Sequence, residues 1–396
     1  MVRSRSTSRP LHALLLPTGP ALVDALRAAL AGGPAVLPID PATPRPQLDR
    51  LIAALRPAAL VTADGVRPCA DAVPVADDVS LVIATSGSTG EPKGVELTTT
   101  ALRHSAAATL ERLDAGPADR WLCCLPTSHI AGLQVLVRSL LAGTDPLLHP
   151  RFDVTAFADA DAEFVSVVPT MLRRLLDAAV DLAGWRTILL GGATIPGALL
   201  DRARAAGATV VTTYGMSETC GGCVYDGVPL TGVGVGLRGD GRVVLSGPML
   251  AERYRLRPDL TAEAFTAEAG RALVTRDIGR WTRDGRLEVL GRADDVIVTG
   301  GVNVAAAQVA DVLAGHPAVA DVAVLGAPDD EWGERVVAVV VPRDATAPPT
   351  LDELRAHVRA RAPREYAPRQ IVLADAIPLL GSGKPDRAAL RALAGG

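Results

Sequence analysis

Lysine is nearly absent from this chain of 396 residues, which carries 40 basic side chains. Only Lys93 and Lys384 are lysines, and all the other basic residues are arginines. Arginine spreads its charge over a planar fork, whereas lysine offers a compact point charge, so the two do not replace each other at a reacting centre. Since both lysines stand in glycine-rich stretches, we interpret them as residues that the chemistry requires.

Long apolar runs and paired cysteines are also missing. No apolar run reaches the roughly 18 residues that span a bilayer, so membrane insertion is excluded. Pro17 ends the apolar run of residues 11–16 too early for a secretion signal, and the five cysteines are an odd number, so we expect a reducing cytoplasm. Cys220 and Cys223 have the spacing of half a zinc site, but no second such pair exists, so zinc is not expected.

The overall charge gives no sign of a polyanionic partner. The net charge is −4, and 48% of the residues are hydrophobic against 21% charged. These values predict an ordered globular protein of two or three domains without a general attraction to nucleic acid. We therefore expect a small-molecule partner.

The order of the predicted elements indicates a layered α/β fold. Short β-rich runs alternate with amphipathic Ala/Leu-rich segments over residues 11–292, and predicted strands cover 81–85, 187–190 and 209–213. A glycine-bearing turn follows each of these three strands. Because ligands bind beyond the carboxyl ends of strands in open α/β sheets, we expect the three turns to line one crevice.

After Arg292 the pattern changes to a smaller α+β unit. We predict a large N-terminal domain, residues 1–292, and a small mobile C-terminal domain, residues 293–396. In the C-terminal domain we expect strands at 322–325 and 335–341 and helices at 305–313 and 351–361.

The stretch TSGSTGEPKG, residues 85–94, predicts a phosphate-binding loop. It is not a Walker A loop, because the lysine of that motif directly follows the second glycine, whereas two residues separate Gly90 from Lys93 here. Hydroxyl side chains, exposed backbone N–H groups and one ammonium group are nevertheless suited to phosphate oxygens. The residues that we expect to contribute are Thr85, Ser86, Gly87, Ser88, Thr89, Gly90 and Lys93.

A second stretch, TTYGMSET, residues 212–219, follows a predicted strand. An adenine ring can lie against Tyr214, and the carboxylate of Glu218 is a hard oxygen ligand suited to Mg²⁺ on a triphosphate. Further along, Asp277 can accept both hydroxyls of a ribose, with Arg292 as its partner. The sequence therefore indicates a nucleotide site.

In this order the motifs resemble the adenylate-forming superfamily of acyl-CoA synthetases, adenylation domains and luciferases. The resemblance covers about residues 81–387. It implies binding of ATP or AMP by the phosphate loop and by Gly191, Gly192, Ala193, Tyr214, Gly215, Ser217, Asp277 and Arg292. It also implies a substrate-side His129, a metal-linked Glu218, a hinge at Asp294, a coenzyme A channel at Gly300 and Gly301, and a catalytic Lys384.

The resemblance implies a two-step ligase. A carboxylate attacks the α-phosphate of ATP with Mg²⁺ present, and coenzyme A then takes the acyl group and releases AMP. Lys384 stands on the small domain, so it acts only when that domain closes over the site, and rotation at Asp294 then admits the thiol. Ala306 and Gln308 depart from the family pattern, which usually has Pro and Glu there.

Within the superfamily, the compact length and the stretch after Glu218 resemble the o-succinylbenzoate:CoA ligases of menaquinone biosynthesis. That subgroup implies that Arg174, beside Arg173, meets the second carboxylate of the acid. Gly221 and Gly222 leave room for an aromatic ring. Three alternatives stay open: another aryl- or acyl-CoA ligase, an enzyme that loads a carrier protein, and a non-catalytic nucleotide-binding regulator. The family resemblance is the only ground for expecting a homodimer.

Overall fold

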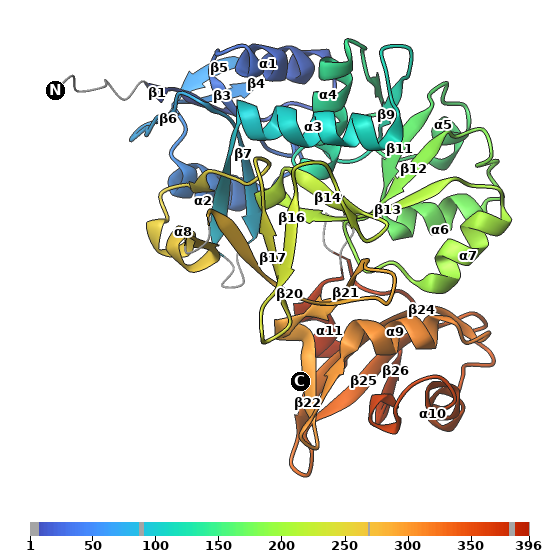
Figure 1. The fold of residues 1–396 in the computed structure, drawn as a ribbon. Coiled ribbons are helices and arrows are strands. Elements are labelled where there is room, and N and C mark those ends of the chain that lie inside the picture. The colour runs from blue at the N-terminus through green and yellow to red at the C-terminus, as the bar shows by residue number, and fades with distance from the viewer. Residues whose placement is uncertain (1–7, 87–90, 268–269, 380–384, 396) are drawn as a thin grey trace.

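The N-terminal domain is built from two sheets with helices between them and on their outer sides (Figure 1). The computed structural model describes residues 8–86, 91–267, 270–379 and 385–395. The chain crosses from sheet to helix and back, as the alternating pattern predicts, which confirms the layered α/β class. Within the described residues, no helix combines the length and apolar character needed to cross a membrane.

The first sheet carries the start of the predicted phosphate loop. Parallel pairing dominates its centre, and β7 and β8 form an antiparallel hairpin beside it. The order of its strands is β18 (Arg253–Tyr254), β8 (Pro92–Thr98), β7 (Val79–Ser86), β3 (Ala35–Pro38), β2 (Leu11–Leu14), β4 (Ala59–Thr62) and β5 (Gly65–Pro68), with β1 (Ser8–Arg9) and β6 (Val75–Ala76) paired separately.

The second sheet carries the other two predicted turns. Its strands up to β13 are parallel, and β14 and β15 are added antiparallel. The order is β10 (Leu147–Leu148), β9 (Trp121–Cys123), β11 (Phe164–Val167), β12 (Thr187–Leu190), β13 (Val210–Met216), β14 (Gly221–Tyr225) and β15 (Val228–Pro229).

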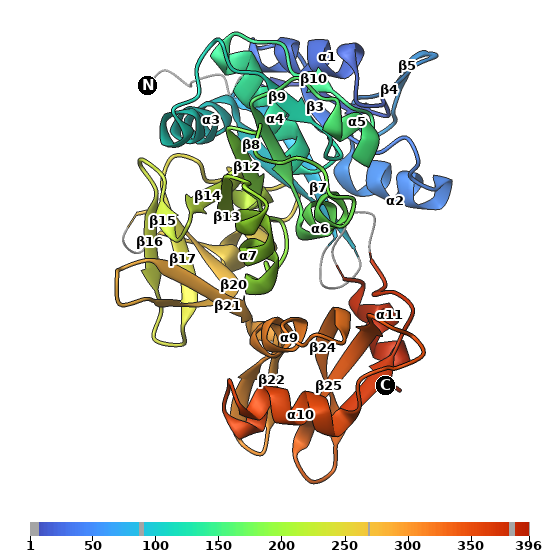
Figure 2. The same cartoon turned by 90° about the vertical axis from the view of Figure 1, so that its right-hand side faces the viewer.

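Helices α3 and α4 lie between the two sheets and join them in one core. Leu102 of α3 and Leu136 of α4 are fully buried there, together with Leu81 of the first sheet and Trp121 of the second. Helices α5, α6 and α7 cover the outer face of the second sheet (Figure 2), and α2 covers that of the first. The bounds are α1 (Pro20–Leu30), α2 (Arg45–Leu55), α3 (Thr99–Leu113), α4 (Ile130–Ala142), α5 (Val154–Ala158), α6 (Pro169–Asp177) and α7 (Gly197–Ala205).

A third, antiparallel sheet leads to the C-terminal domain. It contains β16 (Gly234–Leu237), β17 (Arg242–Ser246), β20 (Ala272–Trp281), β19 (Phe265–Thr266) and β21 (Leu287–Arg292), and α8 (Pro258–Ala264) lies beside it. After β21 a short 3-10 turn, Ala293–Asp295, connects to the first strand of the C-terminal sheet. This turn contains the predicted hinge, Asp294.

The C-terminal domain is an α+β unit with helices on both faces of one sheet. Its elements are β22 (Val296–Thr299), β23 (Val302–Ala305), α9 (Ala306–Ala314), β24 (Val319–Asp329), β25 (Gly333–Pro342), α10 (Leu351–Arg359), β26 (Gln370–Leu373) and α11 (Arg387–Leu393). Helices α9 and α10 pack on one face, and α11 on the other. Although Ala306 replaces the usual proline, α9 still begins there.

Candidate active site

Lys93 stands on a strand and not inside a loop, which corrects the interpretation of residues 85–94 as one continuous turn. Strand β7 runs through Ser86, and β8 begins at Pro92, so that Thr85 lies opposite Lys93 in the hairpin. Proline is tolerated at the first residue of a strand, which explains this start. Gly87, Ser88, Thr89 and Gly90 lie outside the described residues.

The hairpin brings Lys93, in the first sheet, to Glu218, which follows a strand of the second sheet. Glu218 lies in a 3-10 turn, Ser217–Thr219, directly after β13. The Nζ atom of Lys93 is 3.6 Å from Oε1 of Glu218, and the Glu218 side chain is only 11% exposed. The structure therefore joins the two predicted stretches in one site with a carboxylate and an ammonium group side by side.

Tyr254 is a member of this site that the sequence interpretation missed. Its hydroxyl donates a hydrogen bond of 2.6 Å to Oε1 of Glu218, and the Nζ atom of Lys93 lies 4.4 Å above the centre of its ring. Burial, followed by the negative charge of Glu218, raises the pKa of Tyr254. The phenol therefore stays protonated and remains a donor to the carboxylate.

Tyr214 and Asp277, predicted to bind adenine and ribose, touch each other. The hydroxyl of Tyr214 donates to Oδ2 of Asp277 at 2.8 Å. Burial is the main cause that raises the pKa of Tyr214, and the carboxylate of Asp277 adds to it. Asp277 of β20 also lies opposite Arg292 of β21 in the antiparallel register, and the Arg292 side chain is exposed.

Glycine is required where the second sheet faces the site. A Cβ atom on Gly215 would lie 2.0 Å from the carbonyl oxygen of Gly221, and one on Gly191 would lie 2.2 Å from Oγ1 of Thr213. The turn Gly191–Ala193 follows β12 directly, and Gly192 has a φ of +83°. Side chains at these positions would push β12, β13 and β14 apart.

Three of the predicted acyl-side residues, His129, Gly221 and Gly222, lie around α4. His129 is the residue before that helix, and Gln134 of the same helix donates a 2.6 Å hydrogen bond to the carbonyl oxygen of Cys220. Gly221 has a φ of +97°, and a Cβ atom there would meet the Gln134 side chain at 3.5 Å. Gly222 follows it in β14. The backbone of residues 220–222 is thereby held against α4.

The two arginines of α6 differ in their surroundings. Arg173 binds Asp321 of the C-terminal domain, with 2.7 Å between Nη1 and Oδ2. Arg174 is exposed, and within the described residues its guanidinium forms no hydrogen bond or ion pair. Its predicted contact with an acyl substrate stays a prediction.

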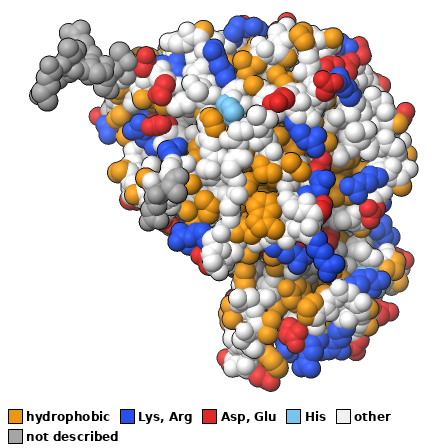
Figure 3. All heavy atoms as spheres, in the orientation of Figure 1, with side chains coloured by type: hydrophobic (Ala, Val, Ile, Leu, Met, Phe, Trp, Pro, Cys, Tyr) orange, Lys and Arg blue, Asp and Glu red, His pale blue; other side chains and the backbone are white. Residues whose placement is uncertain are grey.

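The predicted hinge and channel residues lie on the C-terminal side. Asp294 pairs with Arg276 at 3.3 Å. On the face drawn in Figure 3, Lys and Arg side chains lie near the place where the smaller lower lobe joins the rest of the molecule. Gly300 and Gly301 form the tip of the β22–β23 hairpin, where Gly300 donates to the carbonyl of Trp332 at 2.9 Å. Figure 1 places β22 at the end of this domain away from the N-terminal sheets. Lys384 lies outside the described residues.

Glu218 is the described residue best suited to a metal ion, because a buried carboxylate is the kind of ligand that Mg²⁺ takes alongside nucleotide phosphates. Among the described residues, no three His, Cys, Asp or Glu side chains gather closely enough to hold a metal by themselves.

Comparison with known proteins identifies the family. The family described as AMP-binding enzyme matches residues 64–245, and the AMP-binding enzyme C-terminal domain matches residues 308–384. A probable 2-succinylbenzoate–CoA ligase of Mycobacterium tuberculosis is 46% identical over 79% of this chain and 84% of its own length. The chain belongs to the AMP-binding enzyme family. A feruloyl-CoA synthase of an Amycolatopsis species is 35% identical over 78% of this chain and 68% of its own.

Solved structures share the fold over nearly the whole chain. The o-succinylbenzoate CoA synthetase of Bacillus subtilis, in complex with its acyl-adenylate intermediate, has a TM-score of 0.83 and 28% identity over 96% of this chain and 88% of its own. The same enzyme was solved with ATP and a magnesium ion. The amide bond synthetase McbA of Marinactinospora thermotolerans has a TM-score of 0.86 and 27% identity over 97% and 89% of the two chains.

Proposed function

We propose that this chain is an ATP-dependent ligase that converts o-succinylbenzoate to its coenzyme A thioester, a step of menaquinone biosynthesis. The first step joins the carboxylate to AMP and releases pyrophosphate, and the second transfers the acyl group to coenzyme A. The observation that carries the ligase chemistry is the contact of Lys93 with Glu218, beside the Tyr214–Asp277 pair.

Each described side chain of the site suits a different part of the nucleotide. Tyr214 offers a ring face to adenine, Asp277 keeps a carboxylate oxygen for the ribose, and Lys93 offers an ammonium group to the phosphates. Glu218 would hold Mg²⁺, whose charge, when it is bound, neutralises the phosphates. The family resemblance implies that Lys384 approaches the α-phosphate from the small domain. A donor of this kind stabilises the transition state by about 3–4 kcal/mol.

The choice of acid rests on the similarity to o-succinylbenzoate ligases and on Arg174. An exposed guanidinium can form a bidentate pair with the second carboxylate of a dicarboxylic acid. Gly221 and Gly222 add no side chain to the space beside α4. These features support a flat aromatic ring whose substituent carries a further negative charge.

One observation favours a second candidate, a ligase of a monocarboxylic aryl acid. Arg174 is on the exposed side of α6, its guanidinium has no hydrogen bond or ion pair with the described residues, and a feruloyl-CoA synthase is among the relatives. In that case Arg174 would not influence the choice of acid.

A pyrophosphate-release screen separates the two candidates. Wild-type protein with ATP and Mg²⁺ is offered o-succinylbenzoate, benzoate, ferulate and a medium-chain fatty acid, with coenzyme A as the only thiol. We expect the dicarboxylate to have the highest kcat/KM. Arg174→Ala should lower that value about tenfold to a hundredfold for o-succinylbenzoate alone, the range of a charge-assisted hydrogen bond.

The matched control is Arg202→Ala, which removes an exposed arginine from the neighbouring helix α7. It should leave the ranking of acids unchanged. Equal or better turnover of ferulate by wild-type protein would refute the proposed substrate, and product formation with free coenzyme A would exclude a carrier protein as the required acceptor.

Two further features belong to the proposal, the location of the protein and its oligomeric state. We propose a reducing cytoplasm as the location, which agrees with the five cysteines being free thiols. We also propose a homodimer, on family resemblance alone. Light scattering of the purified protein measures the mass in solution, and a mass of 40.9 kDa would contradict the dimer.

A further inference from the structure

One oxygen of Glu218 receives two contacts from the first sheet. The hydroxyl of Tyr254 lies 2.6 Å from Oε1, and the Nζ atom of Lys93 lies 3.6 Å from the same atom. No described residue donates a hydrogen bond to Oε2. A carboxylate held through one oxygen cannot turn freely, so its other oxygen keeps one direction.

The support of Tyr254 is rigid. Strand β18 pairs with β8, so that Tyr254 lies opposite Val95, two residues after Lys93. The next residue, Arg255, is 2% exposed and binds Glu96 of β8 at 2.9 Å. The backbone N–H of Ala251 donates to the carbonyl oxygen of Glu218 at 2.8 Å. The same segment thus fixes both the backbone and the side chain of Glu218.

Tyr254 itself is anchored from the other side as well. Its backbone N–H donates to Oγ1 of Thr261 in α8 at 3.0 Å, and its ring lies 6.1 Å from that of Phe265. A phenol with this many neighbours loses little further freedom when it binds the carboxylate. Preorganisation of this kind is what a ligand-binding carboxylate needs.

We infer that Tyr254 is a positioning residue: its hydroxyl holds Oε1 of Glu218 so that Oε2 faces the Mg²⁺ of bound Mg²⁺·ATP. The inference rests on the proposed function, because it takes Glu218 as the magnesium-linked carboxylate. Lys93, which shares Oε1, is free to turn to the phosphates while the phenol keeps the carboxylate in place. Tyr254 itself touches neither nucleotide nor acid in this scheme.

The test measures how much Mg²⁺ improves ATP binding. Titration calorimetry gives the Kd of ATP with Mg²⁺ and with EDTA, and the ratio of the two values reports the metal alone. Tyr254→Phe keeps the ring under Lys93 but removes the hydroxyl. We expect the ratio to fall about tenfold, as for the loss of a hydrogen bond to a charged group. A damaged fold would weaken both titrations and leave the ratio unchanged.

Tyr366→Phe is the matched control, because its hydroxyl binds Gln308 within the C-terminal domain at 3.1 Å. It should keep the wild-type ratio. A folded Tyr254→Phe protein with the wild-type ratio would overturn the inference. If that variant does not fold, Tyr254→His, which keeps a ring donor, is compared with Tyr254→Leu, and equal ratios would overturn it.

A double-mutant cycle with Glu218→Gln shows whether the tyrosine acts through this carboxylate. We expect Tyr254→Phe to change the ratio much less in the Glu218→Gln background than in wild type. Additive effects would contradict the inference. Because no acid is present in these titrations, a wrong substrate in the proposed function would leave the result intact.

Discussion

Gly215 shows at the scale of one residue how little space separates β13 from β14. We expect Gly215→Ala to destabilise the fold by about 2–4 kcal/mol, because its Cβ atom would lie 2.0 Å from a backbone carbonyl that cannot move alone. Urea unfolding gives the change in the free energy of unfolding. Gly239→Ala is the control, since nothing lies within 4 Å of its added Cβ atom, and a similar loss there would contradict the explanation.

The buried thiols predict a loss of stability at alkaline pH. Burial raises the pKa of Cys123 and of Cys124 to about 12 from the ordinary value of 9.0. Above pH 9.0 the unfolded chain therefore releases these protons while the folded chain keeps them, so stability that is complete below pH 9.0 falls as the pH approaches 12. At pH 10 the loss is about 1.4 kcal/mol for each thiol.

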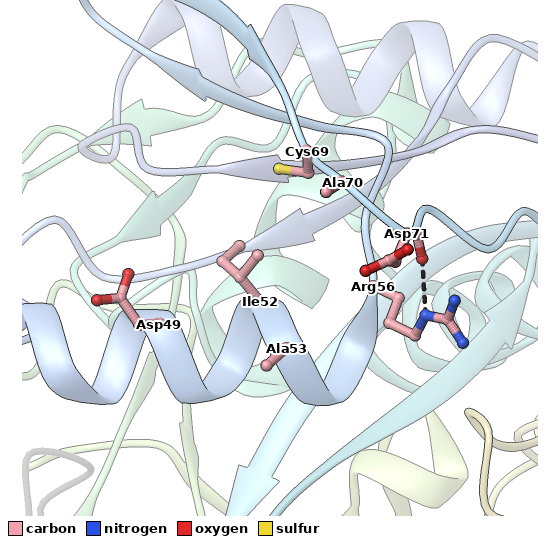
Figure 4. Close-up of a pocket in the computed structure, with 7 residues that line it drawn as sticks. All are labelled: Asp49, Ile52, Ala53, Arg56, Cys69, Ala70 and Asp71. Atoms are coloured by element: carbon pink, nitrogen blue, oxygen red, sulfur yellow. Dashed lines mark hydrogen bonds between the residues drawn. The ribbon is translucent and has the colours of Figure 1, made fainter.

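Urea unfolding with a reducing agent at pH 7.5 and pH 10 measures this loss. Cys124→Ala should show a smaller drop between the two pH values than wild type, and an equal drop would refute the assignment. Cys69 differs from these thiols, because it is only partly buried and lines a pocket beside α2 (Figure 4). We expect it to react first with an alkylating reagent.

At the scale of elements, the helices and strands that have a regular local sequence pattern were predicted correctly. The predicted strand 187–190 is β12, and the predicted helix 351–361 is α10, which Thr350 and Glu353 begin with a capping box. The predicted strands 322–325 and 335–341 proved longer, as β24 and β25. Their ends alternate less clearly, and it is their pairing in the sheet that holds them extended.

Tyr254 could not be predicted, because its position depends on a pairing between distant segments. Strand β18 has two residues, and its partner β8 lies about 160 residues earlier in the chain. A two-residue strand leaves no periodic pattern in a sequence. The scarcity of tyrosine, with four in the chain, was the one available signal.

The Arg255–Glu96 pair decides whether β18 stays on β8. Both side chains are buried, and Arg255 also donates to the carbonyl oxygen of Leu55 at 2.6 Å. Without Arg255 the buried Glu96 keeps only the half-exposed Arg253, 3.4 Å away, so Arg255→Met should cost about 3 kcal/mol. Thermal or urea unfolding measures it. Arg280→Met, which breaks the exposed pair with Glu288 in the β20–β21 hairpin, should cost about 1 kcal/mol or less.

For the whole molecule, the sequence predicted the α/β class and the change of character near residue 292. The orientation of the two domains did not follow from it, because it depends on contacts between residues far apart in the sequence, among them two polar pairs. The backbone N–H of Gly197, at the start of α7, donates to Oδ1 of Asp311 in α9 at 2.7 Å, and Arg173 binds Asp321. Figure 2 shows α9 on the side of its domain that faces the N-terminal domain.

These two contacts belong to one orientation of the domains. In it, Gly300 and Gly301 lie at the tip of the β22–β23 hairpin, and the predicted rotation at Asp294, which would bring them to the site, would break both contacts. We expect the double variant Asp311→Asn with Asp321→Asn to slow pyrophosphate release about threefold to tenfold, the range for two partly exposed contacts. Transfer from purified acyl-adenylate to coenzyme A should stay equal or become faster.

Asp177→Asn is the control for this last prediction, because it removes the exposed pair with Arg202 between α6 and α7 without touching the C-terminal domain. It should leave both half-reactions unchanged. Single-turnover measurements give the rate of adenylate formation and the rate of transfer to coenzyme A separately. If the double variant slows both steps equally, the contacts support the fold in general, and they do not select one domain orientation.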